Sequence, residues 1–577
     1  MNQDDKKPQR PEGSGNSTQP KDNSTQKVWA GNGRVNPSAE GTDAPAHGSQ
    51  ADKPNPSPQK QEKEPTQEAK PRVPKPSQSQ QKNSSHKSVR QSEPIEQPKD
   101  FKSRLASVKT TRWIRFAVVS LLFFLFVIWM ATPWLAIFWL LLIDIYITGY
   151  IPWTWWKKTK GPTRTVLGWL DAIIYALVLV YIIFAFIGQN YKIPSSSLEK
   201  SLLVGDFLWV NKTTYGPRVP NTPLHFPLAQ HTMPIIGGKS YIDSPQLGYH
   251  RLPGFRNVER GDIVVFNFPE GDTILTRMPD ADYYMILQSI MEQGIENPRE
   301  FIRNNPGRFG EIIVRPVDRR ENYVKRVIGL PGDFLQITSD TVKINGKAIG
   351  FADNVQFNYI VPVSRRIADE KWLDLGVRGE DHGSGPITGN EMAGYKYYTV
   401  PLTAAMKAEI ETWPEVSGKI IKENESGYYQ IGGVWPLGNN WEWTRSDTGE
   451  FWIPKRGKTL EVTLNNLPLY RRAIETYEGN KVEVKNNEIY INGEKNPYYT
   501  FKYDYYWMMG DNRDRSLDSR YFGLVPEDHI VGTPQRIMIS IDEERGLTDS
   551  KKIRWNRIFA NPNPDRDKAE EKGWRNN

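Results

Sequence analysis

Residues 166–212 read VLGWLDAIIYALVLVYIIFAFIGQNYKIPSSSLEKSLLVGDFLWVNK, and this stretch passes from a strongly apolar segment to a mixed one. The first part, 166–187, is long enough to cross a bilayer as a helix, because the hydrocarbon core requires about 20 apolar residues. The second part, 193–212, begins with Ile-Pro-Ser-Ser-Ser and continues as an apolar run typical of a β-strand. The stretch therefore predicts a folded domain that starts a few residues beyond a membrane span.

Two further apolar runs, 116–130 and 134–150, precede this stretch. Each reaches the length of a span if its end is extended to Trp113 or to Trp153, and tryptophan is common at membrane interfaces. We therefore expect about three transmembrane helices within 111–190. A single re-entrant hairpin formed by the first two runs is the alternative.

The charged residues around these runs predict the orientation. The segment KKTKGPTR (157–164) and the approach KTTRWIR (109–115) are basic, and positive loops stay on the cytoplasmic side. Residues after 187 are then extracytoplasmic, and the N-terminus is cytoplasmic. Asp144 and Asp171 lie within the spans without a visible partner, and we expect each to be protonated or to face the helix bundle.

Residues 1–110 are rich in Gln, Lys, Pro, Ser and Asn and poor in apolar side chains, which predicts a disordered tail. The formal charge of the whole chain is +8, without any nucleic-acid-binding motif, so no nucleic-acid partner is expected. The chain has no cysteine, which excludes thiol nucleophiles, cysteine zinc sites and disulfides.

Beyond the membrane segment, short apolar runs are separated by Gly, Pro, Asn and Asp, as in 262–266. The segments 333–346 and 481–493 are typical of β-hairpins, and 281–294 is typical of a helix. We expect a mainly β domain with a large insertion. The predicted divisions are a tail 1–110, a membrane domain 111–190, a catalytic core in two parts 191–345 and 478–545, an insertion 346–477 and a polar C-terminal tail 546–577.

A serine hydrolase requires a base, and histidine is the usual one. The seven histidines here lie outside any catalytic motif, and neither Gly-x-Ser-x-Gly nor His-Glu-x-x-His occurs. Lysine can replace histidine when burial lowers its pKa. Lys325 lies between Tyr323-Val324 and Val327-Ile328, which suits a half-buried amine, although a solvated Lys-Arg pair on a strand is the commoner interpretation of that segment alone.

Two other segments are also ambiguous when taken singly. Three consecutive serines, such as 195–197, are usually no more than the polar residues of a loop. The segment GDNRDRSLDSR (510–520) indicates either a hydrogen-bonded loop network or a solvated surface turn.

Taken together, segments 193–212, 260–266, 323–333 and 510–532 resemble type I signal peptidases in content and in order. The run KRVIGLPGD matches the family pattern, and GDNRDRSLDSR differs from it by Arg515 in place of Asn. The serine segment departs further, with Ser196 for Gly, Leu198 for Met, Lys200 for Pro and Ser201 for Thr.

The resemblance implies a Ser/Lys protease fold in which Ser197 is the nucleophile and Lys325 the general base, acting as a neutral amine. It implies that Ser195 donates to the oxyanion and that Ser516 orients the lysine. The implied supporting residues are Arg326, Asp511, Arg513, Asp518 and Arg520, and the implied walls of shallow pockets for small side chains are Ile193, Pro194, Leu198, Leu202, Tyr323 and Val324.

The implied activity is removal of N-terminal signal peptides from exported preproteins at the extracytoplasmic (periplasmic) face of a bacterial cytoplasmic membrane, by a multi-pass protein. Neither a metal nor another cofactor is implied. The expected partners are signal peptides, the lipid bilayer and the protein-translocation machinery. The alternatives are a non-catalytic membrane scaffold derived from such a protease and a self-cleaving repressor with Ser/Lys chemistry; the apolar runs argue against the second.

Overall fold

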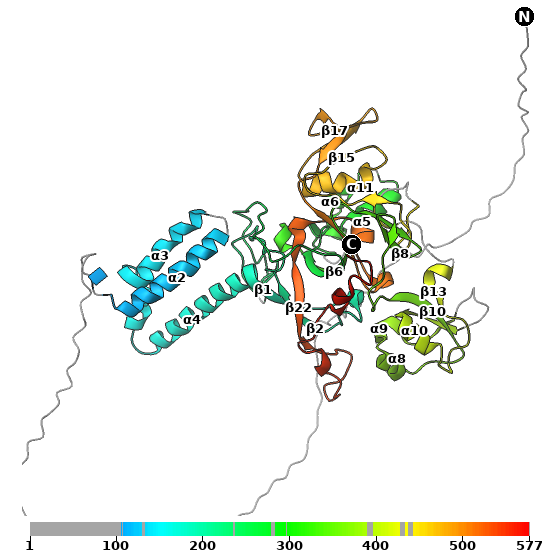
Figure 1. Cartoon of the computed structure of the whole chain (residues 1–577), viewed down its shortest axis with the longest axis horizontal. Coiled ribbons are helices and arrows are strands. Elements are labelled where there is room, and N and C mark those ends of the chain that lie inside the picture. The colour runs from blue at the N-terminus through cyan, green and yellow to red at the C-terminus, as the bar shows by residue number, and fades with distance from the viewer. Residues whose placement is uncertain are drawn as a thin grey trace, which may run out of the picture. The chain divides into compact units, whose positions relative to one another are not determined.

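The computed structural model describes residues 105–106, 108–129, 133–234, 237–278, 283–295, 297–388, 396–426, 433–436 and 442–575 (Figure 1). The predicted tail 1–110 lies outside the described residues except for its last few positions. Everything below concerns the described part of the chain.

The first two apolar runs form an antiparallel helical hairpin. Its elements are α2 (Thr110–Trp129), η1 (Pro133–Phe138), α3 (Trp139–Ile143) and the π-helical turn η2 (Asp144–Thr148). Trp139 Nε1 donates to Ser120 Oγ at 2.9 Å, and the Arg112 guanidinium donates to the Ile145 carbonyl at 3.0 Å. The first contact joins the two arms at the middle of α2, and the second joins the start of α2 to the end of the other arm.

Asp144 is the polar anchor of this hairpin rather than an isolated carboxylate, so the expectation that it lacks a partner is wrong. Its Oδ1 accepts from Thr148 Oγ1 at 2.6 Å and from Tyr150 N at 2.7 Å. Its Oδ2 accepts from Ile151 N at 3.0 Å and from Trp153 Nε1 at 2.9 Å. The carboxylate thereby pairs four donors at and just after the end of η2, which fixes the chain where the helix ends.

The third apolar run forms the helix α4 (Pro162–Ile182) and a π-helical turn η4 (Ile183–Ile187). Two helices in the described residues, Thr110–Trp129 and Pro162–Ile187, are long and apolar enough to cross a membrane. The apolar helix Ala136–Thr148 is shorter. The structure thus contains two candidate spans, and the count of three stays a prediction.

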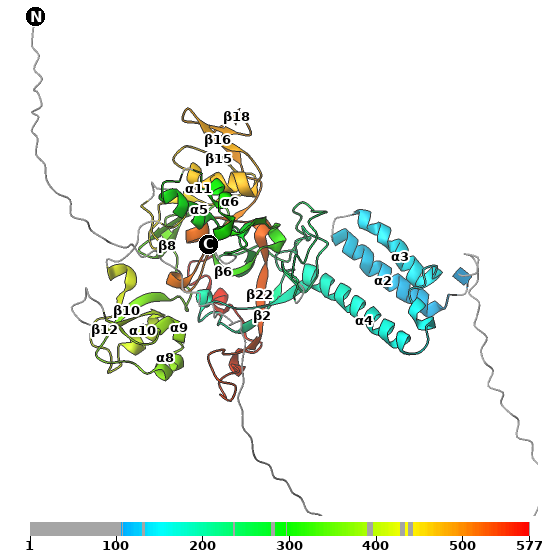
Figure 2. The same ribbon diagram turned by 180° about the vertical axis from the view of Figure 1, so that it is seen from behind.

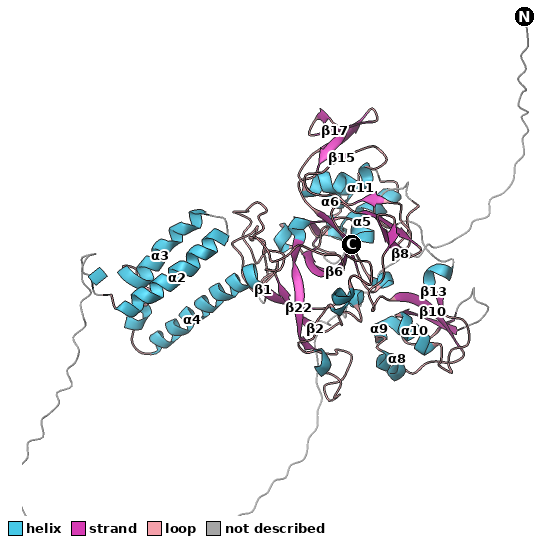
Figure 3. Ribbon diagram, in the orientation of Figure 1, coloured by secondary structure: helices cyan, strands magenta, loops and turns pink. Residues whose placement is uncertain are grey.

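The chain passes from this helix directly into a seven-stranded antiparallel sheet, in the order β1-β2-β22-β3-β6-β20-β21 (Figure 3). The register of the first pair runs from Gly188↔Asn211 to Lys192↔Phe207. The strands are β1 (Gly188–Lys192), β2 (Asp206–Asn211), β3 (Ile263–Asn267), β6 (Asn322–Gly329), β20 (Tyr505–Met509), β21 (Val525–Pro526) and β22 (Ile530–Ser540). The β-rich domain is therefore present as expected.

Both predicted hairpins are present, and each turn has the left-handed backbone that its sequence suits. In 333–346, β7 (Phe334–Thr338) pairs with β8 (Thr341–Ile344), and β14 (Phe451–Trp452) and β9 (Lys347–Ala348) complete that sheet. In 481–493, β16 (Val482–Lys485) and β17 (Glu488–Ile491) pair through Asn486 and Asn487, at φ 51° and 61°. The strand β18 (Glu494–Lys495) extends this sheet (Figure 2).

The predicted insertion contains a four-stranded sheet flanked by short helices. Its strands, in the order β11-β12-β10-β13, are Ile387–Thr388, Lys396–Leu402, Phe357–Val363 and Ile421–Lys422. Its helices are α8 (Asp369–Leu375), α9 (Gly379–His382), α10 (Ala404–Ile410) and α11 (Leu467–Arg472), the last followed by the π-helical turn η8 (Ala473–Tyr477). A further pair joins β15 (Thr459–Glu461) to β19 (Tyr498–Thr500).

The predicted helix in 281–294 is α5 (Tyr283–Glu292), and it lies beside α6 (Pro298–Asn304), α7 (Pro306–Phe309) and the pair β4 (Thr273–Leu275) and β5 (Ile312–Val314). Within the segment predicted as a polar tail, 546–577, the part from Asn563 to Trp574 packs on the core, whereas 546–561 is largely exposed. Trp574 is buried against Gly261, and Asn563 Oδ1 accepts from Arg326 at 2.8 Å.

One hydrophobic core joins the insertion to the seven-stranded sheet. Trp507 of β20 is fully buried and lies 5.3 Å from the Trp435 ring and 4.8 Å from the Phe451 ring. Aromatic contacts at these distances add to the free energy of area burial. The two parts should consequently unfold together.

Replacement of Trp507 by alanine should lower the free energy of unfolding by about 3–5 kcal/mol, because it leaves a cavity in this shared core. Differential scanning calorimetry of the protein in detergent should show one transition at a lower temperature. The control is Trp555→Ala, since the Trp555 side chain is 69% exposed. Two separate transitions, only one of them displaced, would contradict a shared core.

Candidate active site

Ser197 lies in a short 3₁₀ turn, η5 (Ser196–Leu198), between β1 and β2. Its side chain is buried, with 6% of the residue exposed. Leu198 and Leu202 anchor the loop from beneath, because both are fully buried in a cluster with Leu208 and Ile263. The segment 510–512 holds the loop from the other side, where Asn512 N donates to Ser197 O at 3.1 Å.

Lys325 projects from β6, whose register places it opposite Val264 of β3. Its Nζ lies 2.8 Å from Ser197 Oγ and donates also to Val324 O at 3.1 Å. Only 4% of Lys325 and 1% of Arg326 are exposed. A solvated Lys-Arg pair is therefore the wrong interpretation of this segment.

Burial lowers the pKa of Lys325 to about 8, although Asp518 and Asp511 act in the opposite direction. Half of the amine is then neutral near pH 8, whereas a free lysine, with a pKa of about 10.4, is almost wholly charged there. A neutral amine at hydrogen-bond distance from a hydroxyl can accept its proton. The pair can therefore generate a serine nucleophile without histidine.

The Arg326 side chain lies on the opposite face of β6 from Lys325, and it holds the segment 510–512. Its Nε donates to Asp511 Oδ1 at 2.8 Å, and its Nη2 donates to Asp511 Oδ2 at 2.7 Å. Ser201 Oγ donates to the same Oδ2 at 2.6 Å. Burial would raise the pKa of Asp511, but Arg326 outweighs this effect and lowers it. The bidentate pair thereby fixes 510–512 relative to β6 and the serine loop.

Asp518 and Arg520 form a second buried bidentate pair, at 2.9 Å and 2.8 Å. Asp518 Oδ2 also accepts from Gly510 N at 3.0 Å, and Arg520 Nη2 donates to Arg513 O at 2.5 Å. Burial together with Arg520 lowers the pKa of Arg513 to about 10. The segment 510–520 is thus a buried network and not a solvated turn.

Ser195 and Ser516, expected to serve the oxyanion and the lysine, both lie near Ser197. Ser195 is exposed, with its Oγ 3.5 Å from Ser197 Oγ. Ser516 is buried, and its Oγ has no hydrogen-bond partner among the described residues. A Cβ at Gly510 would lie 2.2 Å from Ser516 Oγ and 2.5 Å from Ser197 O, so only glycine fits there. The roles of both serines stay predictions.

The residues expected to form pocket walls divide into two groups. Ile193, Leu198 and Leu202 are buried within one core cluster. Pro194 is exposed, and Tyr323 and Val324 are partly exposed. The second group is the one that can contact a bound peptide in this conformation.

Two contacts to the serine loop were missed by the sequence reasoning. Asn512 Nδ2 donates to Ser196 O at 3.1 Å, and this residue could have been found because it lies inside the segment 510–520. Lys200 Nζ donates to Gly376 O at 2.6 Å, at the end of α8 in the insertion. The sequence carries no sign of this second contact. Within the described ranges, no group of three or more His, Asp or Glu side chains could hold a metal ion.

Comparison with known proteins gives consistent matches. The family described as "Signal peptidase, peptidase S26" matches residues 166–371 and 498–539. A signal peptidase I of Buchnera aphidicola is 23% identical over 65% of this chain and 75% of the relative, and one of Haemophilus influenzae is 23% identical over 67% and 74%. One of Helicobacter pylori is 22% identical over 69% of this chain and 93% of the relative. The matched segments include Ser197, Lys325 and 510–520.

The environment of Lys325 predicts a directly measurable titration. In protein carrying ¹³C-labelled lysine, the Lys325 ε-carbon resonance, assigned by its loss in Lys325→Arg, should titrate near pH 8 because burial disfavours the ammonium form. The control is the Lys325→Arg variant, which should lack this one resonance and keep the other lysine resonances unchanged. A Lys325 resonance that titrates near the value of a free lysine, about 10.4, would contradict the buried, neutral amine.

Proposed function

The chain belongs to the type I signal peptidase family, and from this premise we propose that Ser197 and Lys325 form the catalytic dyad with which it, a serine endopeptidase, removes signal peptides from preproteins. The observation that carries the proposal is the 2.8 Å contact between Lys325 Nζ and Ser197 Oγ, both buried. A non-catalytic scaffold is disfavoured by the same contact, because both reactive groups are retained within proton-transfer distance.

In the proposed reaction, neutral Lys325 accepts the Ser197 proton as Oγ attacks the scissile carbonyl. The oxyanion receives hydrogen bonds from the backbone N–H of Ser197 and from Ser195 Oγ. The Lys325 ammonium then protonates the leaving amine, which leaves an acyl-enzyme on Ser197. In the second half, Lys325 accepts a proton from water as the water oxygen attacks the acyl carbonyl. The bond between Ser197 Oγ and the acyl carbon then breaks, Oγ takes the proton back from the Lys325 ammonium, and the signal peptide leaves as a carboxylate.

The proposed supporting role of the two arginine–aspartate pairs is electrostatic as well as mechanical. Arg326 and Arg520 neutralise the carboxylates of Asp511 and Asp518, which would otherwise raise the pKa of Lys325 further. Ser516, buried without a partner beside Gly510, has a hydroxyl available to orient the amine without adding charge.

The proposed substrate is an extended peptide with small side chains next to the scissile bond. Pro194, Tyr323 and Val324 supply the surface that limits side-chain size. The strand β1 is an edge of the sheet, and an edge offers unpaired backbone groups to an added strand. β1 also follows the helix ending at Ile187 directly, so the domain would bind the cleavage site of a signal peptide close to the membrane surface, where that site leaves the bilayer.

For location, we propose a bacterial cytoplasmic membrane with the β-rich domain on the extracytoplasmic side. The basic segment 157–164 precedes α4, and the domain follows that helix. This orientation holds whether the hairpin 110–148 crosses the membrane twice or is re-entrant. Contact with the translocation machinery belongs to the same proposal.

Activity should depend on Lys325 in two ways that one experiment can measure. Below pH 8, kcat/KM on a signal-peptide substrate should rise about tenfold per pH unit and then level off, because only the neutral amine is the base. Lys325→Arg and Ser197→Ala should lose at least about a hundredfold, since guanidinium stays charged and alanine has no nucleophile.

The control for these variants is Lys347→Arg, an exposed lysine that should retain full activity. Full activity in Lys325→Arg would exclude Lys325 as the base. So would a flat profile from pH 5 to pH 10 with chemistry shown to be rate-limiting.

Reporter fusions should give opposite locations on the two sides of α4. A fusion after residue 190 should behave as extracytoplasmic, and a fusion within 1–100 as cytoplasmic, because the basic segment 157–164 stays inside. Protection of the β-rich domain from protease in intact spheroplasts would contradict this orientation.

A further inference from the structure

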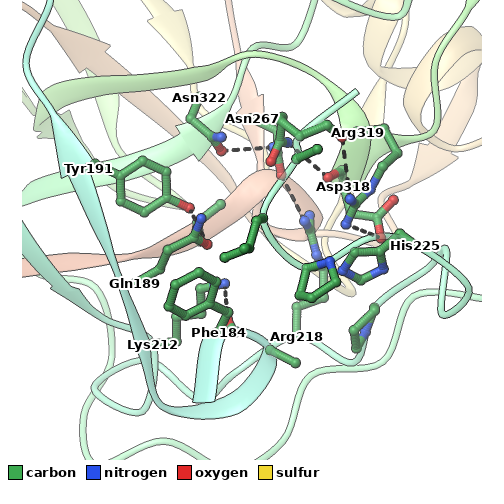
Figure 4. A pocket seen from close by; sticks show the side chains of 17 residues that line it. Phe184, Gln189, Tyr191, Lys212, Arg218, His225, Asn267, Asp318, Arg319 and Asn322 are labelled. Carbon is green, nitrogen blue, oxygen red and sulfur yellow. Dashed lines mark hydrogen bonds and ion pairs between the residues drawn. The ribbon is translucent and has the colours of Figure 1, made fainter. Parts of the chain in front are cut away.

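A cavity of about 300 Å³ lies at the end of α4 where the chain enters the β-rich domain (Figure 4). Phe184 and Ala185 of the last helical turn form one part of its wall, and Tyr191 of β1 and Asn322 of β6 form another. The dyad does not line this cavity.

Its wall carries an excess of positive charge. Lys212, Arg218 and Arg319 line it, against a single carboxylate, Asp318. That carboxylate is already engaged, since its oxygens accept from Thr222 N at 2.9 Å and from Thr222 Oγ1 at 2.8 Å. Three cationic side chains therefore face one carboxylate that already accepts hydrogen bonds from Thr222. The wall has a formal excess of two positive charges.

The hydrogen bonds of these cations are incomplete within the described residues. Arg319 Nη2 lies 3.6 Å from Asp318 Oδ2 and Arg319 donates to Gln230 O at 3.3 Å, but its buried Nε has no partner. Lys212 Nζ has one acceptor, Phe184 O at 2.5 Å. Burial of three cations against a single carboxylate is costly, so this arrangement suits an anionic ligand.

The state of Lys212 agrees with an anion-deficient site. Burial, together with Arg218 and Arg319, lowers its pKa to about 7, against the opposing effect of Asp318. His225, also in the wall, has its pKa lowered by burial and by Arg319, so it adds no charge near neutral pH. A bound anion would restore the charge on Lys212.

The cavity lies at the end of the candidate span Pro162–Ile187, where a bilayer crossed by that helix would place its headgroups. Lys212 N donates to Ile187 O, the last residue of the apolar helix, at 2.9 Å. The loop that supplies His225 also contacts the helix, because Tyr181 OH donates to Pro223 O at 2.9 Å and the Tyr181 and His225 rings lie 4.9 Å apart. A headgroup phosphate lies immediately beyond the hydrocarbon core, at this level.

We propose that the cavity formed by Lys212, Arg218 and Arg319 binds a phosphate group, and that the phosphodiester of a phospholipid in the adjacent leaflet supplies it. Arginine and lysine together suit this ligand, because guanidinium donates in a planar fork to phosphate oxygens and ammonium acts as a compact charge. The bound headgroup would tie the β-rich domain to the membrane surface on the side where β1 begins.

The test uses the full-length chain, delipidated in a non-ionic detergent, and native mass spectrometry. The probes are dioctanoyl-phosphatidylglycerol, dioctanoylglycerol, which lacks the phosphate, and inorganic phosphate as a competitor. The phosphatidyl lipid should bind and the glycerol lipid should not. Arg319→Gln and Lys212→Gln should each weaken binding of the phosphatidyl lipid by about tenfold, as expected for loss of one charge-assisted contact.

The controls separate a specific site from general charge and from poor folding. Lys347→Gln removes one exposed positive charge outside the cavity and should bind lipid as the wild type does. Arg319→Lys keeps the charge and should retain more affinity than Arg319→Gln. The wild-type comparison of the two lipids needs no variant and holds even if a substitution impairs folding.

Three outcomes would overturn the proposal in different ways. Equal binding of dioctanoylglycerol would exclude a phosphate site. Displacement of the lipid by inorganic phosphate at equal concentration would overturn the lipid as source. The third outcome is an unchanged lipid affinity in both glutamine variants together with a raised KM for a short soluble peptide in lipid-free detergent. This outcome would assign the cavity to peptide binding instead. It would not affect the proposed dyad or its pH dependence.

Discussion

The chemistry proposed for this protein depends on a lysine that is buried and has no direct carboxylate partner among the described residues. Lys325 Nζ donates to Ser197 Oγ and to a backbone carbonyl, while two aspartates close by are paired with arginines. If either aspartate were free to pair with the amine, the ammonium form would be favoured and the base lost. The two ion pairs are therefore less a source of stability than a means of keeping charge away from Nζ, since a buried pair contributes little net free energy of folding.

The same pairs explain why the segment 510–520 is dense in charge. The two aspartates have different partners. Asp511 accepts from Arg326 of β6 and from Ser201, and Asp518 accepts from Gly510 N and from Arg520. Gly510 then passes between Ser516 and the Ser197 carbonyl, where a larger residue has no room. Sequence reasoning found this segment because so many partners must be supplied within a few residues, which leaves an unusual composition.

Features set by neighbouring residues could be predicted from the sequence, whereas contacts between distant residues could not. The apolar helix 162–187, the hairpins 333–346 and 481–493 and the helix near 283–292 depend on local periodicity and turn residues, and all are present. The partners of Asp144 lie within a few residues, but a turn geometry had to be known to recognise them. The packing of Trp574 on Gly261 and the contact of Lys200 with α8 join positions far apart in the chain, and no composition rule points to such pairs.

The contact of Lys200 makes the insertion inseparable from the serine loop. Lys200 has φ 71°, a left-handed backbone that proline, fixed near −65°, cannot adopt, so the proline typical of the family at this position is incompatible with the loop as it stands. Its amine is held by the carbonyls of Leu375 and Gly376, both inside the insertion. An engineered short version that lacks the insertion would leave this half-buried ammonium without these acceptors, three residues from Ser197. Such a minimal enzyme would have to be redesigned at residue 200 and in the backbone around it before any loop could be spliced across the gap.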